Sequence, residues 1–334
     1  DQVSCFITYT NPKTHKIIHS SLSQSPLYTG KIKATGVRYC PSIEDKIVKF
    51  SERDRHQIFL EPEGRHTIEV YPNGLSTSLP LEIQKKMINS IEGLEHAQIL
   101  RPGYGIEHSV VDPLQLNPTL ETKLIDGIYL AGQINGTTGY EEAAAQGLVA
   151  GINAALKVKG EPPLILDRSN SYIGVLIDDL VTKGTNEPYR MFTSRVEYRL
   201  TIREDNADLR LRQIGYNVGL VSHEDFEKTK EKKKMIETEL DRLKRIKLKP
   251  SKEINTRLKN WDTAGISRPV SLEELLKRPH VNYAMLKELN HSQLDLPFDV
   301  IQQVEIQVKY QGFIQRELSN IEKFKHLEKI KLPI

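Results

Sequence analysis

The sequence predicts an α+β fold on three observations. Residues 1–77 alternate short apolar runs with Asn, Pro and Gly turns, a pattern typical of strands. The apolar run 127–131 enters a glycine-rich turn and then a segment of small residues with helical spacing. Beyond about residue 160 the chain is charged and carries helix-capping signals with few strand signals. We therefore expect a β-rich beginning, a strand–turn–helix unit and a helical remainder.

Composition narrows the class of protein. With 334 residues, two or three domains are expected. No apolar run approaches the ~18 residues of a membrane span, so no membrane association is expected. Cys5 and Cys40 are too few for a disulfide framework, which predicts a reducing compartment such as the cytosol. The net charge of +3 gives a weak overall field, so nucleic-acid binding requires local patches.

The first 95 residues read as strands and turns followed by a helix. Because a strand signal stands at the very start of the chain, we expect an excised fragment of a longer protein. The predicted elements are strands at 3–10, 57–60 and 67–71, a turn at 11–13, and a helix over 79–91 capped by Ser78.

The middle part holds the strand, turn and helix named above. Two short strands are predicted at 97–100 and 109–111, ahead of the strand at 127–131. The helix of small residues is predicted to begin near Gly139. Gly160–Pro163 predicts the boundary with the helical part.

The helical part shows clear start signals. A capping pair, Ser194 and Glu197, predicts a helix over 198–202. Ser222 predicts the start of a long polar helix that ends near Ile246, and the charges of 228–249 alternate in sign as on a solvated face. The remaining signals are an apolar stripe of that helix (Ile236, Leu240, Leu243), a capping pair (Ser271, Glu274) and a last helix at 298–327.

The glycine-rich run 132–147 is the most informative segment. A helix that opens on glycines presents backbone N–H groups and its positive dipole end, which suit an anionic or electron-rich ligand. The alternative is a glycine turn before a tightly packed core helix, and this segment alone does not decide between them.

Charged residues crowd around Cys40. A thiol near Arg38 and Lys46 can have a lowered pKa and act as a nucleophile. The alternatives are a half-buried structural cysteine, or a loop that holds the phosphates and ribose hydroxyls of a dinucleotide. His56 is expected to be structural, and no spacing of metal-ligand residues predicts a metal site.

Four arginines, Arg190, Arg195, Arg199 and Arg203, form the last candidate site. The final three stand four residues apart and would form one positive stripe on a helix. Aromatic residues lie among them, and this combination suits RNA. The alternative is a network of internal ion pairs with nearby acids, namely Glu197, Glu204, Asp205 and Asp208.

Five long motifs occur here in one order and together resemble the GidA/MnmG family, the FAD-dependent tRNA wobble-uridine modification enzymes. The resemblance covers essentially the whole chain. The motifs are Arg38–Lys46, Asp54–Gly64, Tyr71–Pro80, Gly132–Gly147 and Glu187–Arg195.

The resemblance implies addition of a carboxymethylaminomethyl group at C5 of the wobble uridine of certain tRNAs. It implies FAD and NADH as cofactors, methylenetetrahydrofolate as one-carbon donor, the GTPase MnmE as partner, and a homodimer. The compartment implied is the cytoplasm, or the mitochondrion for a eukaryotic source. The fold implied is part of a Rossmann-like FAD-binding domain (96–160) with a β-rich NAD-binding insertion (1–95), followed by an all-α domain (161–334) for tRNA and partner binding.

The resemblance also assigns residues. Cys40 matches a cysteine that the family needs for activity, and Gln133 matches the family's FAD contact beside Gly132 and Gly139. Arg190 and Arg199 match arginines linked to tRNA binding or activity, with Arg195 and Arg203 beside them. The segment that resembles the family's NAD site comprises Gly36, Val37, Arg38, Tyr39, Pro41, Ser42, Ile43, Glu44, Asp45, Lys46, Ile47, Val48, Lys49 and Phe50.

One departure from the family matters. The chain has no GxGxxG fingerprint, because His108 stands where the third glycine would follow Gly103 and Gly105. We expect the chain alone to bind FAD poorly and to be inactive, with the family's last helices, which contact MnmE, also missing. The alternative functions are a folate- and FAD-dependent tRNA uridine methyltransferase, or a non-catalytic RNA-binding or docking fragment.

Overall fold

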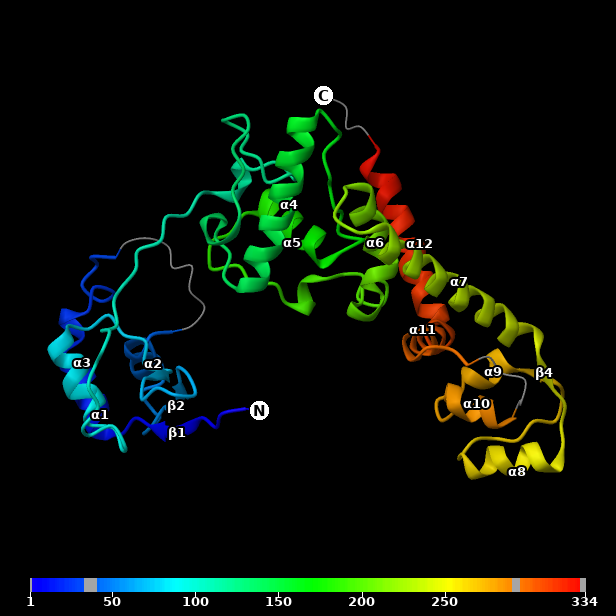
Figure 1. Cartoon of the computed structure of the whole chain (residues 1–334), viewed down its shortest axis with the longest axis horizontal. Coiled ribbons are helices and arrows are strands. Elements are labelled where there is room, and N and C mark those ends of the chain that lie inside the picture. Colours follow the sequence, from blue (N-terminus) through cyan, green and yellow to red (C-terminus); the bar gives the residue numbers. More distant parts are fainter. Residues whose placement is uncertain (1, 33–40, 290–294, 331–334) are drawn as a thin grey trace. The chain divides into compact units, whose positions relative to one another are not determined.

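The computed structural model describes residues 2–32, 41–289 and 295–330 (Figure 1). The chain divides into two compact units, which we describe separately. The first unit comprises residues 1–116, 130–147 and 184–190, and the second comprises 117–129, 148–183 and 191–334. The predicted division at residues 95 and 160 stays a prediction. No helix of the described residues is long and apolar enough to cross a membrane.

A three-stranded antiparallel sheet with helices forms the N-terminal part of the first unit. The strand order is β1–β2–β3, with Ile7 opposite Phe59 and Leu60 opposite Pro72. The bounds are β1 Phe6–Tyr9, α1 Pro12–His19, η1 Leu22–Gln24, α2 Ile43–Lys49, β2 Gln57–Pro62, β3 Val70–Asn73 and α3 Leu81–Ile88. The predicted strands at 57–60 and 67–71 thus pair as β2 and β3, although β3 begins only at Val70. The core joins these elements through Ile18, Ile43, Ile47, Ile58, Leu75, Leu79, Met87 and Ile91.

Two predicted local features of this unit are wrong. Asn11 does not make a turn between strands; its side chain accepts a hydrogen bond from Thr14 N at 3.0 Å and caps α1. Proline is common both in turns and at the first position of a helix, so Pro12 does not distinguish the two. Ser78 does not cap α3, because its N–H and hydroxyl donate to Glu44, and the helix begins after Pro80.

The predicted strands at 97–100, 109–111 and 127–131 do not form within the described residues. The segment 127–131 makes a single bridge, Tyr129 with Glu121, before it enters η3 Gly132–Asn135. A strand needs a partner along its length, and one bridge does not provide it. The helix predicted from Gly139 is confirmed as α4, Tyr140–Lys159, which begins in the first unit and ends in the second.

The second unit is helical. Its elements are α5 Tyr172–Lys183, η4 Thr193–Arg195, η5 Glu204–Asn206, α6 Ala207–Asn217, α7 His223–Arg245, β4 Lys247–Leu248, α8 Lys252–Asn260, β5 Val270–Ser271, α9 Leu272–Leu276, α10 Tyr283–Leu289, α11 Phe298–Lys309 and α12 Gln311–Glu328. In Figure 1, α7 leads to a group formed by β4, α8, α9 and α10 at its C-terminal end. The remaining short element, η2 Pro113–Gln115, belongs to the first unit.

Several local predictions in this unit are confirmed. Ser222 accepts from Asp225 N and caps α7, and Ser271 with Glu274 forms a reciprocal capping box on α9. Ile236 and Leu243 of the predicted stripe are buried in the main core. The predicted last helix is two helices, because the backbone leaves helical geometry at Tyr310 (φ −103°, ψ 10°).

Candidate functional site

The glycine turn between η3 and α4 has a backbone that other residues do not readily adopt. Gly136 has φ +77° and Gly139 has φ +132°, both in the left-handed region. A Cβ on Gly139 would also collide with the carboxylate of Glu142. Both positions therefore require glycine.

A buried glutamine on α4 holds this turn in shape. Gln146 Oε1 accepts from Gly132 N at 3.2 Å and from Asn135 Nδ2 at 2.8 Å. Its Nε2 donates to Thr137 Oγ1 at 2.9 Å, and Thr137 Oγ1 donates to Gly132 O at 3.0 Å. Asn135, Thr137 and Gln146 are all at most 1% exposed. We call Gly132, Asn135, Thr137 and Gln146 the polar knot.

Sequence reasoning missed this polar knot. The signal was present, because Gln146 shares the buried face of α4 with Val149 and Ala150, three and four residues further on. A polar side chain on such a face requires partners. Gln133, which sequence analysis did propose, is exposed between the buried Gly132 and Asn135 and so faces outward from the turn.

The structure brings Arg190 to the glycine turn. Tyr189 N donates to Gly136 O and Thr138 N donates to Tyr189 O, each at 2.9 Å. Arg190 Nη2 then lies 3.2 Å from Glu141 Oε1 in the first turn of α4. The pKa of Glu141 is lowered by a hydrogen bond from the backbone of Glu141 and by Arg190. The proposed cofactor and RNA segments thus meet within one unit.

Acidic residues mark the start of α4. Glu141 and the buried Glu142 stand in its first turn, where they offset the positive end of the helix dipole. A second negative group such as a phosphate is disfavoured there. A neutral ring edge with acceptor atoms is the better match to this turn.

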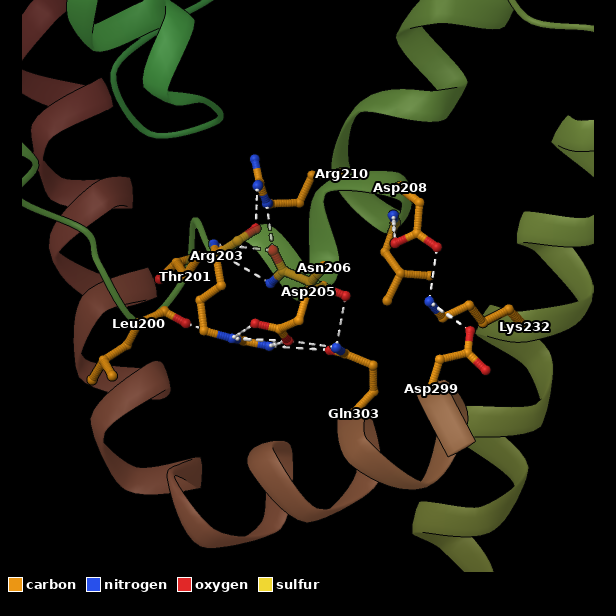
Figure 2. A network of polar contacts seen from close by, with 11 residues as sticks. Leu200, Thr201, Arg203, Asp205, Asn206, Asp208, Arg210, Lys232, Asp299 and Gln303 are labelled. Carbon is orange, nitrogen blue, oxygen red and sulfur yellow. Dashed lines mark hydrogen bonds and ion pairs between the residues drawn. The ribbon is translucent and has the colours of Figure 1, made fainter. Parts of the chain in front are cut away.

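The other arginines do not form the predicted helical stripe. Arg195 ends the short η4, and residues 196–203 are not helical. Arg199 is exposed, whereas Arg203 is half-buried and binds Asp205 through Nε at 3.0 Å and Nη2 at 2.9 Å. Gln303 of α11 joins the same cluster, accepting from Arg203 Nη2 at 3.0 Å (Figure 2). The spacing of four was misleading because Arg203 is held in a loop by Asp205, two residues further on, and by the distant Gln303.

Two of the acids proposed as alternative partners, Glu197 and Asp208, bind other cations. Glu197 pairs with Arg168 at 2.6 Å, and Asp208 pairs with Lys232 at 2.8 Å. Burial acts against ionisation of Asp205, but hydrogen bonds from Arg203 and Gln303 hold its pKa below the ordinary value. Arg203 is thereby built into the fold.

The segment resembling an NAD site is described from Pro41 to Phe50. Gly36, Val37, Arg38, Tyr39 and Cys40 lie outside the described residues. In the described part, Ser42 and Asp45 form a capping box on α2.

The rest of α2 contributes largely to packing. Ile43 and Ile47 enter the core. Glu44 is fully buried and accepts from Ser78 N at 2.9 Å. The pKa of Tyr28 is raised to about 12, first by burial of the side chain and then by the nearby Asp45. The described residues contain no group of three metal-ligand side chains.

Comparison with known proteins agrees with the motifs. The family model "Glucose inhibited division protein A" matches residues 1–162, and "tRNA modifying enzyme MnmG/GidA C-terminal helical domain" matches 223–318. Two proteins named "tRNA uridine 5-carboxymethylaminomethyl modification enzyme MnmG" are similar. The one from Caldicellulosiruptor saccharolyticus is 56% identical and the one from Bacillus licheniformis 55% identical, each over 333 residues that make up 100% of this chain and 53% of the relative.

A solved structure agrees as well. Aquifex aeolicus GidA, in its form II crystal, superposes with a TM-score of 0.79 at 50% identity, over 99% of this chain and 51% of that chain. The chain thus spans about half the length of the relatives that it matches.

Proposed function

This chain belongs to the GidA/MnmG family, and we propose that it is part of a flavin-dependent enzyme that builds the 5-carboxymethylaminomethyl group on the wobble uridine of tRNA. The structural observation that carries the proposal is the junction of the glycine turn with Arg190 through Glu141 and Tyr189. A glycine turn next to a cation that suits an RNA phosphate supports this function. The names of the relatives favour this function over the folate-dependent methyltransferase.

The residues present fit one part of a flavin. Gln133 is exposed on the turn, and the glycines allow a ring edge to approach the backbone. The pyrophosphate would not be held here, because the start of α4 carries Glu141 and Glu142 and the chain has no GxGxxG run. When bound, FAD supplies hydride chemistry. The chain's own role is to orient the ring edge through the turn that the polar knot holds.

Six further assignments belong to this proposal. NADH is the reductant, with the segment from Gly36 to Phe50 as its binding segment, and methylenetetrahydrofolate is the one-carbon donor. MnmE is the partner GTPase, the protein is a homodimer, and it works in the cytoplasm. Cys40 acts either as a nucleophile on the uracil ring or in proton transfer. These assignments rest on the motifs that the chain shares with the family.

The arginines divide into two groups in this proposal. Arg199 is exposed and Arg190 faces the turn, so both suit contact with the anticodon arm, with Arg195 beside them. Arg203 contributes by holding the loop, because its guanidinium binds Asp205 and Gln303. Loss of Arg199 should weaken tRNA binding across sequences and reduce its salt dependence.

Two substitutions in the whole protein test the proposal. Gln133→Ala should lower the affinity for FAD, measured by flavin fluorescence, while the exposed Gln213→Ala on α6 leaves it unchanged. Cys40→Ser should abolish modification, measured by nucleoside mass spectrometry, while flavin content stays normal. Full modification by the Cys40→Ser protein would remove its catalytic role, and an absence of flavin from the unsubstituted protein would remove the flavin assignment.

A further inference from the structure

A strongly basic surface lies at the C-terminal end of α7, separate in sequence from the arginines that sequence analysis proposed for RNA. Residues 245–268 hold seven Lys and Arg against two acids, a net charge of +5. Since the whole chain carries +3, the remaining residues sum to −2. Positive charge is therefore concentrated in this short stretch, which forms the end of α7, β4, α8 and the loop before β5 (Figure 1).

The lysines of this stretch point to solvent because their neighbours point to the core. In β4, Leu248 packs against the main core, so Lys247 and Lys249 on either side of it lie on the opposite face. In α8 and its C-cap, the residues packed against or within the core are Ile254, Leu258 and Trp261, at i, i+4 and i+7. Lys252 and Lys259 lie opposite them on the helix. All four lysines are exposed.

These lysines are not used inside the fold. Among the described residues, no ion pair is formed by Lys247, Lys249, Lys252 or Lys259. Of the two acids, Glu253 already binds Arg257 at 3.1 Å, so it does not offset them. Asn255 binds both backbone groups of Ile266 and fixes the loop against α8, which keeps the surface in one shape.

The chemistry of the surface selects a polyanion. Among the described residues between Leu220 and Phe298, no large hydrophobic side chain is exposed. A protein partner would need an apolar centre to its interface, and a membrane would need the apolar face of α8, which is buried in the core. Lysine ammonium groups on flexible stems suit phosphates as point charges.

We propose that Lys247, Lys249, Lys252 and Lys259 form a second RNA contact, which binds the phosphate backbone of the tRNA outside the modification site. This rests on the proposed function, since it assigns a further surface to the same substrate. The contact adds affinity and positions the tRNA without reading its sequence, because phosphates carry no base information.

The test uses the whole protein and an unmodified tRNA transcript with uridine at the wobble position. The patch variant replaces the four lysines by Gln. The control variant loses the same formal charge, because four other exposed lysines are replaced by Gln. These lysines do form ion pairs: Lys85, Lys228, Lys230 and Lys325. Binding is measured by fluorescence anisotropy from about 50 to 200 mM salt.

We expect the patch variant to bind on the order of 100-fold more weakly at low salt, with the slope of log K against log salt reduced by about three. The affinity of the control variant should lie within about threefold of that of the unsubstituted protein. A variant with all four lysines of the patch replaced by Arg should keep most of the affinity, because it keeps the charge. Equal losses in the patch and control variants, or no loss in the patch variant, overturn the assignment. If the unsubstituted protein does not bind the tRNA, the proposed function itself fails.

Discussion

Gln146 on α4 accepts a hydrogen bond from the backbone N–H of Gly132, fourteen residues earlier, at 3.2 Å inside the protein. With Asn135 and Thr137, this contact makes the glycine turn a fixed structure rather than a loose loop. The side chain that shapes the turn is therefore on the helix that follows it.

Removal of Gln146 should destabilise the first unit. Gln146→Ala leaves Asn135 Nδ2 with one partner fewer and Gly132 N without its buried acceptor, at a cost of about 2–4 kcal/mol. Urea unfolding monitored by circular dichroism measures this free energy. The matched control is Gln213→Ala, an exposed glutamine on α6, which should change it by less than about 0.5 kcal/mol. Similar values for the two variants would contradict the role given to the polar knot.

Two glycines of the same segment should respond in opposite directions to alanine. Gly139→Ala forces a left-handed backbone (φ +132°) on a residue whose Cβ meets Glu142, and should cost about 1–3 kcal/mol. Gly147→Ala lies inside α4 with open space around its Cβ position, and should stabilise by about 0.5–1 kcal/mol. Thermal unfolding of both variants gives the comparison, and stabilisation by Gly139→Ala would refute the strained turn.

The cluster of Arg203, Asp205 and Gln303 predicts a pH-dependent contribution to stability. The pKa of Asp205 is lowered in the fold, so the unfolded chain binds its proton more readily, and the contribution is full above the unfolded pKa of ~3.9. It is lost as pH falls through the folded pKa. Asp205→Asn should therefore cost about 1–3 kcal/mol at pH 7 and progressively less below about pH 4. A difference between the two proteins that does not change from pH 7 to pH 3 would contradict this.

Two substitutions around a buried acid in the second unit should destabilise the protein to different extents. Glu239 is fully buried and accepts from Tyr283 OH at 2.8 Å and from Arg242 Nη2 at 2.7 Å. Glu239→Ala leaves a half-buried guanidinium without its partner, which should cost about 3–5 kcal/mol. Tyr283→Phe removes one hydrogen bond and should cost about 1–2 kcal/mol. Burial and Glu239 also raise the pKa of Tyr283, so ultraviolet titration should show one late-ionising tyrosine fewer in Tyr283→Phe than in the unsubstituted protein.

Features set by neighbouring residues could be predicted from the sequence. Ser222 and Ser271 cap helices through residues three positions away, and the hairpin of β2 and β3 is likewise local. The arginine stripe failed because Arg203 binds Gln303, a hundred residues further along. Spacing alone cannot reveal such a partner.

The glycine turn shows the same limit within the candidate site. Sequence patterns identified the turn and the helix after it, but not that Tyr189 lies alongside Thr137 and brings Arg190 to Glu141. That arrangement depends on packing between segments fifty residues apart. The roles of Cys40 and of residues 36–39 stay predictions, because these residues lie outside the described part of the chain.

The measurement that tests the central claim most directly is nucleoside mass spectrometry of tRNA from the source organism with the gene for this protein deleted. We predict that wobble 5-carboxymethylaminomethyl uridine and its derivatives disappear, and that the whole protein restores them. Unchanged levels of these nucleosides in the deletion strain would contradict the proposed function.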